Sequence, residues 1–499
     1  MWMLLKMAWR NLWRHRRRSF LTLLAMTIGL YACHVTLAIG DGAHRQMIDI
    51  ATAGFLGQIQ LNGRKYQDTR RQYLVVKDQS KAVRLLQKLS TRDSTLPASL
   101  KPWKSRLRGW SRRINGAGLV STGDHSGGSL LLGLDLSQEH KVTRLPSILF
   151  RTIASNAALA RPGSVLAKKQ ALFSSAYLQG LRSLWKQHPD NATRRDAAIH
   201  KLTKKLYPTL PAKASFWKKL VADKEIVLGR GLAATLKAKV GQPLAVITQA
   251  LDGSAGNDRF TIVAIAESGN EELDHSLCIL TLEAMRELLV MKGRSHQLIL
   301  RLNKAEHHQI VGLTKALRKE LASELSLHPG TRKQGKTFEV FSWNEVSPEL
   351  YELIKIDEAG GYITIIILFM LVVFGILNTL LMSVMERIRE FGLLQSLGLK
   401  SRRLMLLVVS EGMFLALVST IVGFAFSIPT ILYLYSTQVP LGEPMRMGGI
   451  TFQMTLTANL TWFGVFFSAT MVFVTTFLVS LFPAWKVRSL RPAEALRYQ

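Results

Sequence analysis

The sequence is poor in cysteine and in acidic residues. Two cysteines, Cys33 and Cys278, occur among 499 residues, and no C-x-x-C pair is present, which excludes a disulfide framework. Cys33 lies inside an apolar run and Cys278 lies far along the chain, so we expect no disulfide between them. Asp and Glu number 34 against 65 Lys and Arg, a net charge of +31. This balance favours an anionic partner, either nucleic acid or a membrane.

Recognisable catalytic and metal-binding arrangements are also scarce. No G-x-S-x-G elbow occurs. The candidates that do occur are one set of nucleophilic-triad residue types and two pairs with metal-ligand side chains, namely Asp124-His125-Ser126, His307-His308 and Asp274-His275. Adjacent side chains rarely point at one another, and neither pair has convergent ligand spacing around it. We therefore expect no catalytic residues and no metal site in this chain.

A phosphate-binding expression is present in an unsuitable context. Residues Gly330–Thr337 fit G-x-x-x-x-G-K-[ST]. That loop needs a strand before it and a helix after it, so that backbone amides and a helix N-terminus hold phosphate. Here Pro329 and a helix-like stretch precede the run, and the strand-like Phe338–Phe341 follows it. A polar hairpin loop is the better interpretation, and we expect no nucleotide cofactor in this chain.

Long apolar runs dominate what the sequence does contain. They are Phe20–Ile39 with 20 residues, Tyr362–Met385 with 24, Leu404–Tyr435 with 32 and Trp462–Ala484 with 23. Each is long enough to cross about 30 Å of hydrocarbon as a helix. A signal peptide is the alternative for the first run, although the apolar core of a signal peptide usually has only about 7–15 residues. Of the two anionic partners that the net charge allows, the apolar runs favour a membrane. We expect no nucleic-acid partner.

The basic residues of the short segments predict how these spans are oriented. Met1–Ser19 contains six Lys and Arg, Glu386–Arg403 contains five and Trp485–Gln499 contains four, whereas Ser436–Thr461 contains one. The positive-inside rule places the first three segments in the cytoplasm. Residues 40–361 then form a large extracytoplasmic domain, and residues 436–461 form an external loop. Tryptophans and cations at helical spacing in residues 1–19 predict an amphipathic interfacial helix, and a plain basic flank is the alternative.

The external domain is predicted to be α+β. Strand-like runs separated by turn residues occupy its second half, at Leu244–Thr248, Phe260–Ala266, Leu277–Thr281, Gln297–Leu302 and Phe338–Phe341. Apolar residues at helical spacing between Ile310 and Leu321 predict one amphipathic helix. The strands do not alternate regularly with helices, which favours α+β.

Residues 64–219 carry most of the excess charge. They contain 31 Lys and Arg against 8 Asp and Glu, a balance of +23. Tryptophans are interleaved with this charge, at Trp103, Trp110, Trp185 and Trp217. One interpretation is a solvated basic surface. The other is a face for anionic lipid headgroups or another acidic ligand, with Lys204, Lys205, Lys218 and Lys219 as candidate lipid contacts.

Polar residues inside the apolar runs are functional candidates because burying them in hydrocarbon is costly. Glu411 is expected to pair with a basic residue of Glu386–Arg403 or of the N-terminal helix. His34 and Asn378 are expected to form interhelical hydrogen bonds. Three such residues are too few for a proton relay or an ion pore.

The segment Glu386–Lys400, E-R-I-R-E-F-G-L-L-Q-S-L-G-L-K, is the most specific motif. In it Ile388, Phe391, Leu394 and Leu397 recur three apart, close to helical spacing. With Glu411-Gly412 it resembles the permeases of ABC transporters of the MacB, LolC–LolE and FtsX type. Three further stretches are similar to that family, Ala8–Thr22, Gly57–Asp68 and Arg491–Arg497. Residues 150–222 match least, because they look enlarged and basic.

The resemblance implies a permease subunit in a bacterial inner membrane, with four spans, both termini cytoplasmic and a periplasmic domain. It implies two copies of a cytosolic ABC ATPase that bind ATP and Mg, a second permease copy or a paralogue, and contact with membrane lipids. A periplasmic acceptor protein is a further candidate partner. Residues that match the family's coupling segment are expected to transmit movement from the ATPase. They are Glu386, Arg387, Arg389, Glu390, Phe391, Gly392, Leu394 and Gly398.

The same resemblance implies mechanotransmission without passage of substrate through the bilayer. Extraction of lipoprotein or lipid from the inner membrane is the leading expectation for the transported substrate. The alternatives are efflux of peptides or toxins of the MacB type and FtsX-type signalling to a cell-wall enzyme.

Overall fold

The structure is a computed structural model. It describes residues 6–7, 9–10, 16–69, 74–91, 95–187, 192–209, 211, 213–268, 271–303, 307–322, 338–397, 399–437, 439–440, 445–447, 450–452 and 455–488. The chain divides into two units, which we call the helical unit and the sheet unit. The helical unit comprises Met1–Met47, Glu352–Glu443 and Gln453–Gln499, and the sheet unit comprises Ile48–Tyr351 and Pro444–Phe452.

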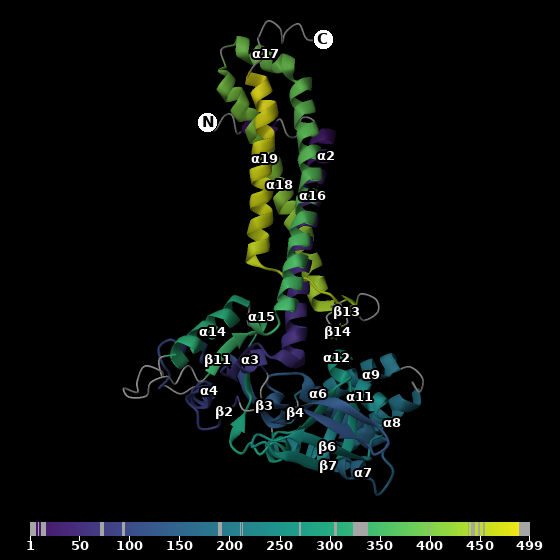
Figure 1. Ribbon diagram of the computed structural model, residues 1–499. Helices are drawn as coiled ribbons and strands as arrows, with labels where there is room; N and C mark the ends of the chain where they lie inside the picture. The colour runs from purple at the N-terminus through teal and green to yellow at the C-terminus, as the bar shows by residue number, and fades with distance from the viewer. Residues whose placement is uncertain are drawn as a thin grey trace, which may run out of the picture. The chain divides into compact units, whose positions relative to one another are not determined.

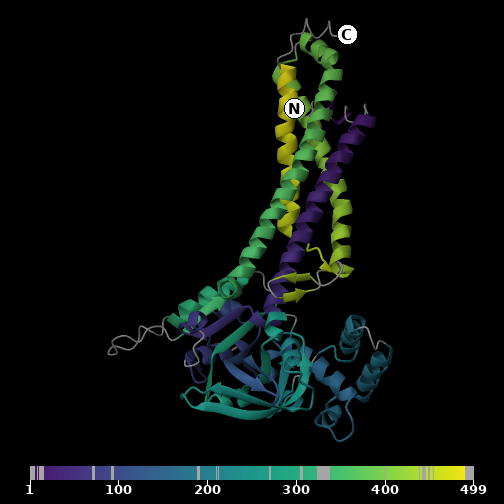
Figure 2. The ribbon, with the colours of Figure 1, turned by 45° about the vertical axis from the view of Figure 1, so that its right-hand side comes forward.

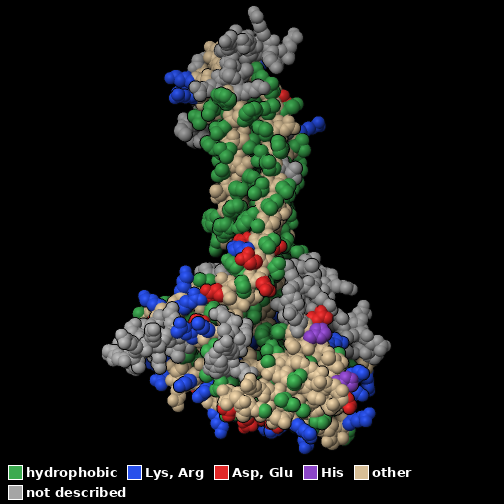
Figure 3. Space-filling model, viewed as in Figure 1, with side chains coloured by type: hydrophobic (Ala, Val, Ile, Leu, Met, Phe, Trp, Pro, Cys, Tyr) green, Lys and Arg blue, Asp and Glu red, His purple; other side chains and the backbone are tan. Residues whose placement is uncertain are grey.

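Four long helices supply most of the helical unit. They are α2 (Arg16–Ala51), α16 (Pro348–Glu386), α18 (Ser401–Thr437) and α19 (Trp462–Arg488). By length and composition, four helices of the described residues are able to cross a membrane, and hydrophobic side chains cover the face of them seen in Figure 3. The predicted fold class is therefore confirmed: an α-helical membrane protein with four transmembrane helices and a large domain of helices and strands between the first and the second.

The helices of this unit pack closely around a shared apolar core. Met26 and Leu30 of α2 meet Leu380 of α16, Ala416 of α18 and Val472 of α19 in one buried cluster. In Figures 1 and 2 the four helices run alongside one another. Glycine makes one of these approaches possible, because a Cβ at Gly423 would lie 2.6 Å from a methyl carbon of Leu30. Small residues serve the same purpose at many membrane helix contacts.

The two helices that border the large domain are longer than their apolar runs. Helix α2 continues from the run's end at Ile39 to Ala51, and α16 begins at Pro348, before its run starts at Tyr362. Polar contacts are made along these extensions, where His44 Nε2 lies 2.8 Å from Asp357 Oδ2. Apolar composition thus marks the segment that crosses hydrocarbon, while the helix itself continues as long as its backbone remains hydrogen-bonded.

The sheet unit is built on nine strands in the order β11-β1-β10-β3-β4-β8-β5-β7-β6, with β3 also paired to β6. Their bounds are β1 Ile59–Gly63, β3 Leu107–Ser121, β4 Ser126–Leu134, β5 Glu225–Gly229, β6 Pro243–Gln249, β7 Ala255–Ala266, β8 Leu277–Thr281, β10 Gln297–Leu302 and β11 Phe338–Ser342. Because β3 pairs with both β4 and β6, the strands from β3 to β6 close into a barrel. Only β4–β8 and β5–β7 are parallel among the pairs between described strands.

The strands expected in the second half of the domain are present in β6, β7, β8, β10 and β11, and the expected helix is α14 (His307–Ala322). The sequence gives no such signal for the long hairpin β3–β4. Strand β3 reads L-R-G-W-S-R-R-I-N-G-A-G-L-V-S, and Leu119 on it is 58% exposed while Arg113 is buried. Its polar and apolar positions therefore do not follow the simple alternation of a half-buried strand.

A layer of helices covers one side of the barrel. It comprises α5 (Leu136–Glu139), α6 (Leu145–Ala158), α7 (Val165–Lys169), α8 (Ser175–Gln187), α9 (Ala192–Leu206) and α10 (Ala214–Leu220). Aromatic rings fill its core, where Phe150 packs against Phe173, Tyr177 and Tyr207. Lys169 Nζ lies 2.7 Å from Glu225 Oε2, so α7 is tied to β5 by a largely buried ion pair.

This layer corrects one expectation about the basic region. Trp217 is 1% exposed, stacks on His140 and donates its indole N–H to the Pro211 carbonyl, and Trp110 is 8% exposed. Both tryptophans are buried and offer no exposed ring to a lipid surface, although the Arg112 guanidinium lies 4.9 Å from the Trp110 ring centroid. Tryptophan has a large apolar body, so burial is its ordinary use in such a layer.

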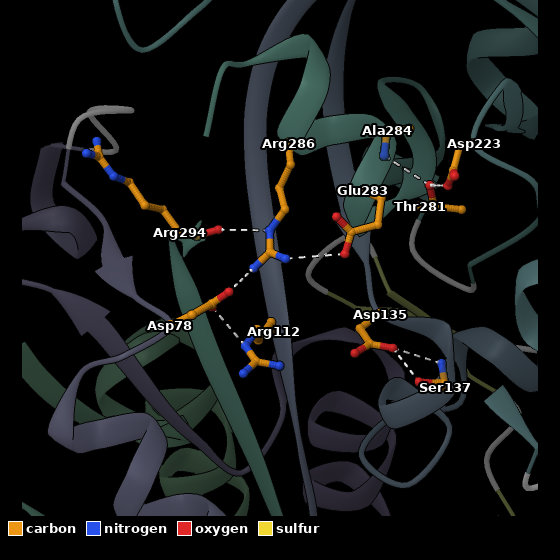
Figure 4. Close-up of polar contacts among 10 residues, drawn as sticks. All are labelled: Asp78, Arg112, Asp135, Ser137, Asp223, Thr281, Glu283, Ala284, Arg286 and Arg294. Atoms are coloured by element: carbon orange, nitrogen blue, oxygen red, sulfur yellow. Dashed lines mark hydrogen bonds and ion pairs between the residues drawn. The ribbon is translucent and has the colours of Figure 1, made fainter. Parts of the chain in front are cut away.

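The remaining described elements are short. The helices are α3 (Tyr66–Thr69), α4 (Lys81–Thr91), α11 (Arg230–Thr235), α12 (Glu271–Asp274), α13 (Leu282–Leu288) and α15 (Trp343–Val346). The short strands are β2 (Val76–Lys77), β9 (Arg294–Ser295), β12 (Val439–Pro440), β13 (Met445–Met447), β14 (Ile450–Phe452) and β15 (Thr455–Leu456). Asp78, which follows β2, forms ion pairs with Arg286 at 2.7 Å and with Arg112 at 3.1 Å (Figure 4). These pairs tie the end of β2 to α13 and β3.

Candidate coupling site

The site lies in the segment that connects the end of α16 to the start of α18. Helix α16 ends at Glu386, Arg387 leaves helical geometry with φ −106° and ψ 12°, and a separate helix α17 runs from Ile388 to Ser396. The α17 end is closed by Leu399 N donating to Leu394 O at 3.0 Å. The sequence thus produces a nine-residue helix between two membrane-spanning helices.

Arg387 is the centre of the site's polar contacts. Its Nη1 lies 2.9 Å and 3.1 Å from the two carboxylate oxygens of Glu411, and its Nε lies 3.0 Å from Glu390 Oε2. The Arg387 side chain is 8% exposed and that of Glu411 is 13% exposed. Burial alone would lower the pKa of Arg387, but Glu411 and then Glu390 more than offset it, so the pKa is raised. The guanidinium therefore remains charged and ties α17 to the first turns of α18.

One face of α17 is buried. Phe391 is 1% exposed, lies under the Arg387 guanidinium at 5.1 Å, and packs with residues of all three neighbouring helices. Ile388 and Gly392 are also buried and Leu394 is half-buried. These positions therefore fix the orientation of α17, and any effect of theirs on a partner would pass through packing.

The opposite face of α17 is exposed. Leu393 is 51% exposed and Leu397 is 76% exposed, with Arg389 exposed beside them. Further exposed charges flank this face at Glu386, Lys400, Arg402 and Arg403. We call Arg389, Leu393 and Leu397 the α17 edge. It combines cationic and large apolar side chains, which is the composition of a protein-docking surface.

Spacing alone did not identify this edge. The series Ile388, Phe391, Leu394 and Leu397 recurs every three residues, and each such step falls about 60° short of a full helical turn. By Leu397 the direction has rotated from the buried face to the exposed one, so the series does not lie on a single face. Leu393 is outside the series and was missed. Gly398 lies outside the described residues.

The intramembrane polar residues have different environments. Glu411 does pair with a basic residue of the preceding segment, as described above. His34 Nδ1 lies 2.8 Å from Ser427 Oγ, which links α2 to α18. Asn378 is exposed on α16, and its side chain makes no hydrogen bond to any residue that the structure describes, so its interhelical hydrogen bond stays a prediction.

A second arrangement of charges, which the sequence did not indicate, holds the end of α2 inside the sheet unit. A π-helical turn, Thr52–Leu56, follows α2. Asp49 bridges Arg144 and Arg301, each at 2.6 Å. Arg113 Nη1 donates to Phe55 O at 2.6 Å, and Arg144 N donates to Ala53 O at 2.6 Å. A helix C-terminus leaves carbonyls without partners and favours cations, so these arginines stabilise it. We call this arrangement the α2 socket.

The other candidate residues are dispersed. Lys204, Lys205, Lys218 and Lys219 are exposed on α9 and α10. Asp124 and His125 lie in the turn of the β3–β4 hairpin, where Thr122 N donates to His125 O. The two cysteines, Cys33 and Cys278, are both free and buried.

The candidate metal and phosphate residues are only partly described. Asp274 is 6% exposed and accepts from Ser268 N, and burial raises its pKa. The side chains of His307 and His308, and the run Gly330–Thr337, lie outside the described residues. The described elements flanking that run are α14 before it and β11 after it, the reverse of the order that a phosphate-binding loop requires.

Comparison with known proteins follows the same division of the chain. Residues 362–492 match the model of the FtsX-like permease C-terminal family. LolC of the lipoprotein-releasing system is 23% identical over 285 residues in Xylella fastidiosa and 23% identical over 286 residues in Neisseria meningitidis. Each of these matches covers 55% of this chain and 65% of the LolC chain. The macrolide export ATP-binding/permease protein MacB of Chlorobium luteolum is 32% identical over 127 residues, which is 25% of this chain and 16% of MacB.

Among solved structures, the periplasmic region of MacB from Actinobacillus actinomycetemcomitans aligns with 62% of this chain and 98% of its own length, at a TM-score of 0.28 and 9% identity. The family match spans the apolar run of α16 from Tyr362, the α17 segment that carries the site, and helices α18 and α19. The comparisons agree with the resemblance drawn from Glu386–Lys400: residues 362–492 match an FtsX-like permease domain, and relatives of this chain are named LolC, LolE and MacB.

Proposed function

We propose that this chain is the permease subunit of an ABC transporter and that the α17 edge is the docking surface for a separate ATPase subunit. The observation that carries the proposal is the division of α17 into two faces. Its inner face is fixed by Phe391 and the Arg387–Glu411 pair, while Leu393 and Leu397 remain exposed. A helix that is held firmly on one side and apolar on the other is suited to receive force from a partner. The partner binds ATP and Mg, and this chain transmits its movement.

Replacing both exposed leucines tests this docking surface. We expect the variant L393S/L397S to lose most co-purifying ATPase, because truncating central apolar contacts weakens an interface by about 2 kcal/mol or more, roughly 30-fold. The measurement is pull-down of the full-length chain from membranes followed by ATPase assay. Leu406→Ser is the matched control, because Leu406 is 52% exposed on α18 outside the edge. Equal recovery of ATPase with the double variant would refute the assignment.

For the orientation, we propose cytoplasmic termini and a periplasmic large domain in a bacterial inner membrane. The support is the concentration of Lys and Arg in the short segments that include α17. A membrane-impermeant thiol reagent should label Ser436→Cys from outside, and Lys400→Cys only after permeabilisation. Both positions are exposed, and the opposite labelling pattern would reverse the orientation.

We further propose that the transported substrate is a lipoprotein or lipid extracted from the inner membrane. The support is the match to LolC over more than half of this chain. MacB-type efflux of peptides or toxins and FtsX-type signalling to a cell-wall enzyme are the alternatives, and a second permease copy or a paralogue completes the assembly. Depletion of this protein is expected to strand lipoproteins in the inner membrane. Correct lipoprotein localisation after depletion would leave the alternatives.

For the basic helical layer, we propose contact with anionic lipid headgroups through Lys204, Lys205, Lys218 and Lys219. Each basic residue near an anionic surface contributes about 1 kcal/mol. Replacing all four with Gln is therefore expected to weaken binding to phosphatidylglycerol vesicles by at least tenfold at low salt. Lys224→Gln is the control, since Lys224 pairs with Asp258. Unchanged vesicle binding would make the region a passive solvated surface.

A further inference from the structure

The outer part of the α2 socket carries more positive charge than it compensates. The carboxylate of Asp49 lies between Arg144 and Arg301, at 2.6 Å from each. Arg108 is a third guanidinium beside this pair. Burial lowers the pKa of Arg301, Asp49 opposes that effect, and the charges of Arg108 and Arg144 then lower the pKa further. Three guanidiniums therefore surround one carboxylate, which leaves an excess of two positive charges among these four residues.

Arg108 reaches this place through an irregularity in the sheet. On β3, Gly109 is opposite Arg301 and Leu107 is opposite Leu302, so Arg108 is an extra residue without a partner on β10. A bulge of this kind redirects a side chain and is common next to functional sites. The Arg108 side chain is exposed, and no ion pair joins it to any residue that the structure describes. Its guanidinium is therefore available to a ligand.

The chain that leads into α6 brings Arg144 to the same place. A Cβ at Gly109 would lie 2.6 Å from Lys141 Cβ, so this chain packs directly beside the bulge. Arg144 is the N-cap of α6, whose first turn has no acidic residue, and the helix N-terminus adds partial positive charge. The Arg144 side chain is 55% exposed and donates to Asp49 through Nη2. A guanidinium has five N–H donors, so its exposed edge retains donors for a ligand.

We propose that Arg108, Arg144 and Arg301 form a binding site for a phosphate group, carried by an anionic lipid headgroup or by free phosphate. Guanidinium groups bind phosphate oxygens through paired N–H donors. A phosphate monoester carries a charge of about −1.5 to −2 at pH 7, which matches the excess positive charge. Arg301, 11% exposed, supplies charge from the inner side, and the exposed Arg108 and Arg144 reach the ligand. This site lies on β3, β10 and the start of α6, whereas the four lysines proposed above lie on α9 and α10, so the inference goes beyond that proposal.

Phosphate binding to the purified full-length chain tests the site. The chain is kept in a maltoside detergent, which carries no phosphate, and inorganic phosphate is titrated by calorimetry. Arg108→Gln should weaken binding by about tenfold or more, because a hydrogen bond between charged groups is lost, and R108Q/R144Q should abolish saturable binding. Arg108→Gln leaves both contacts of Asp49 intact, so its result does not depend on the stability of the socket. Arg259→Gln is the matched control, since Arg259 is exposed on β7 outside the site.

A second probe identifies the source of the phosphate group. Dioctanoylphosphatidic acid is titrated in the same way, with dioctanoylglycerol as the control for its acyl chains. Tighter binding of the phosphatidic acid than of inorganic phosphate, lost in Arg108→Gln, would identify a lipid headgroup, and equal binding would identify the phosphate group alone. Equal affinity of Arg108→Gln and wild type for both probes, or an equal loss in Arg259→Gln, would overturn the site. All these variants keep the four lysines and the α17 edge, so failure here leaves the proposed function to its own tests.

Discussion

Replacing Glu411 with Ala is expected to destabilise the helical unit by about 3 kcal/mol and to uncouple ATP hydrolysis from this subunit. Breaking one side of a buried ion pair commonly costs about 3–5 kcal/mol, and the low end applies because Glu390 still lies 3.0 Å from Arg387. Without Glu411, the 8%-exposed guanidinium loses two hydrogen bonds, and α17 loses its ion-pair link to α18. Thermal unfolding in nanodiscs and ATPase stimulation by the reconstituted chain are the measurements.

Two controls separate the ion pair from general damage at this position. The double variant R387M/E411L replaces both charges with apolar side chains and should be more stable than Glu411→Ala alone, since no buried charge is left unpaired. Glu267→Ala removes one partner of the exposed pair Arg230–Glu267 and should change stability by less than about 1 kcal/mol. Equal melting temperatures for Glu411→Ala and wild type would contradict the role given to this pair.

Replacing Glu139 with Ala should destabilise the sheet unit by about 3–5 kcal/mol. The Arg113 and Glu139 side chains are 1% and 0% exposed and lie 2.5 Å apart. Glu139 also accepts from Thr143 at 2.7 Å, and Arg113 donates to Phe55 O in the α2 socket. Loss of the carboxylate leaves the arginine buried with a single neutral acceptor. Chemical unfolding followed by tryptophan fluorescence measures the effect.

The apolar pair R113M/E139L is the matched control for this substitution. If the ion pair acts through charge compensation, that double variant should recover much of the lost stability. A double variant as unstable as Glu139→Ala would instead point to a packing defect, and the socket would then not depend on its charges. Glu267→Ala again provides the exposed reference pair.

The sequence predicted the membrane helices well because hydrocarbon imposes a composition that no soluble segment of this chain shares. Each run between Phe20 and Ala484 that was taken as a span lies inside one long helix. Helix ends were less predictable, since α2 continues through Asp41 and His44 with its backbone bonds intact. Strands β6, β7, β8, β10 and β11 were predicted because they are apolar and bounded by turns, whereas β3 mixes buried arginine with exposed leucine.

The sites were less accessible to sequence reasoning because they depend on contacts between distant segments. The α2 socket brings together Arg113, Arg144 and Arg301 from separate elements, and in the sequence these arginines resemble any other basic residue of a strongly basic domain. The same holds for Asn378, whose polarity was evident but whose exposed direction depends on which face of α16 packs against its neighbours. Leu393 was missed because spacing indicated an apolar series without showing where burial ends.

The most direct test of the central claim is site-specific photo-cross-linking from Leu397, which is 76% exposed at the α17 edge. A photoreactive phenylalanine analogue is placed at position 397 in the full chain in native membranes, with the same analogue at Leu417, 44% exposed on α18, as control. We predict an ATP-binding protein cross-linked from position 397 and absent from position 417. Cross-links from position 397 to lipid alone, while the transporter hydrolyses ATP, would contradict the assignment of α17 as the coupling helix.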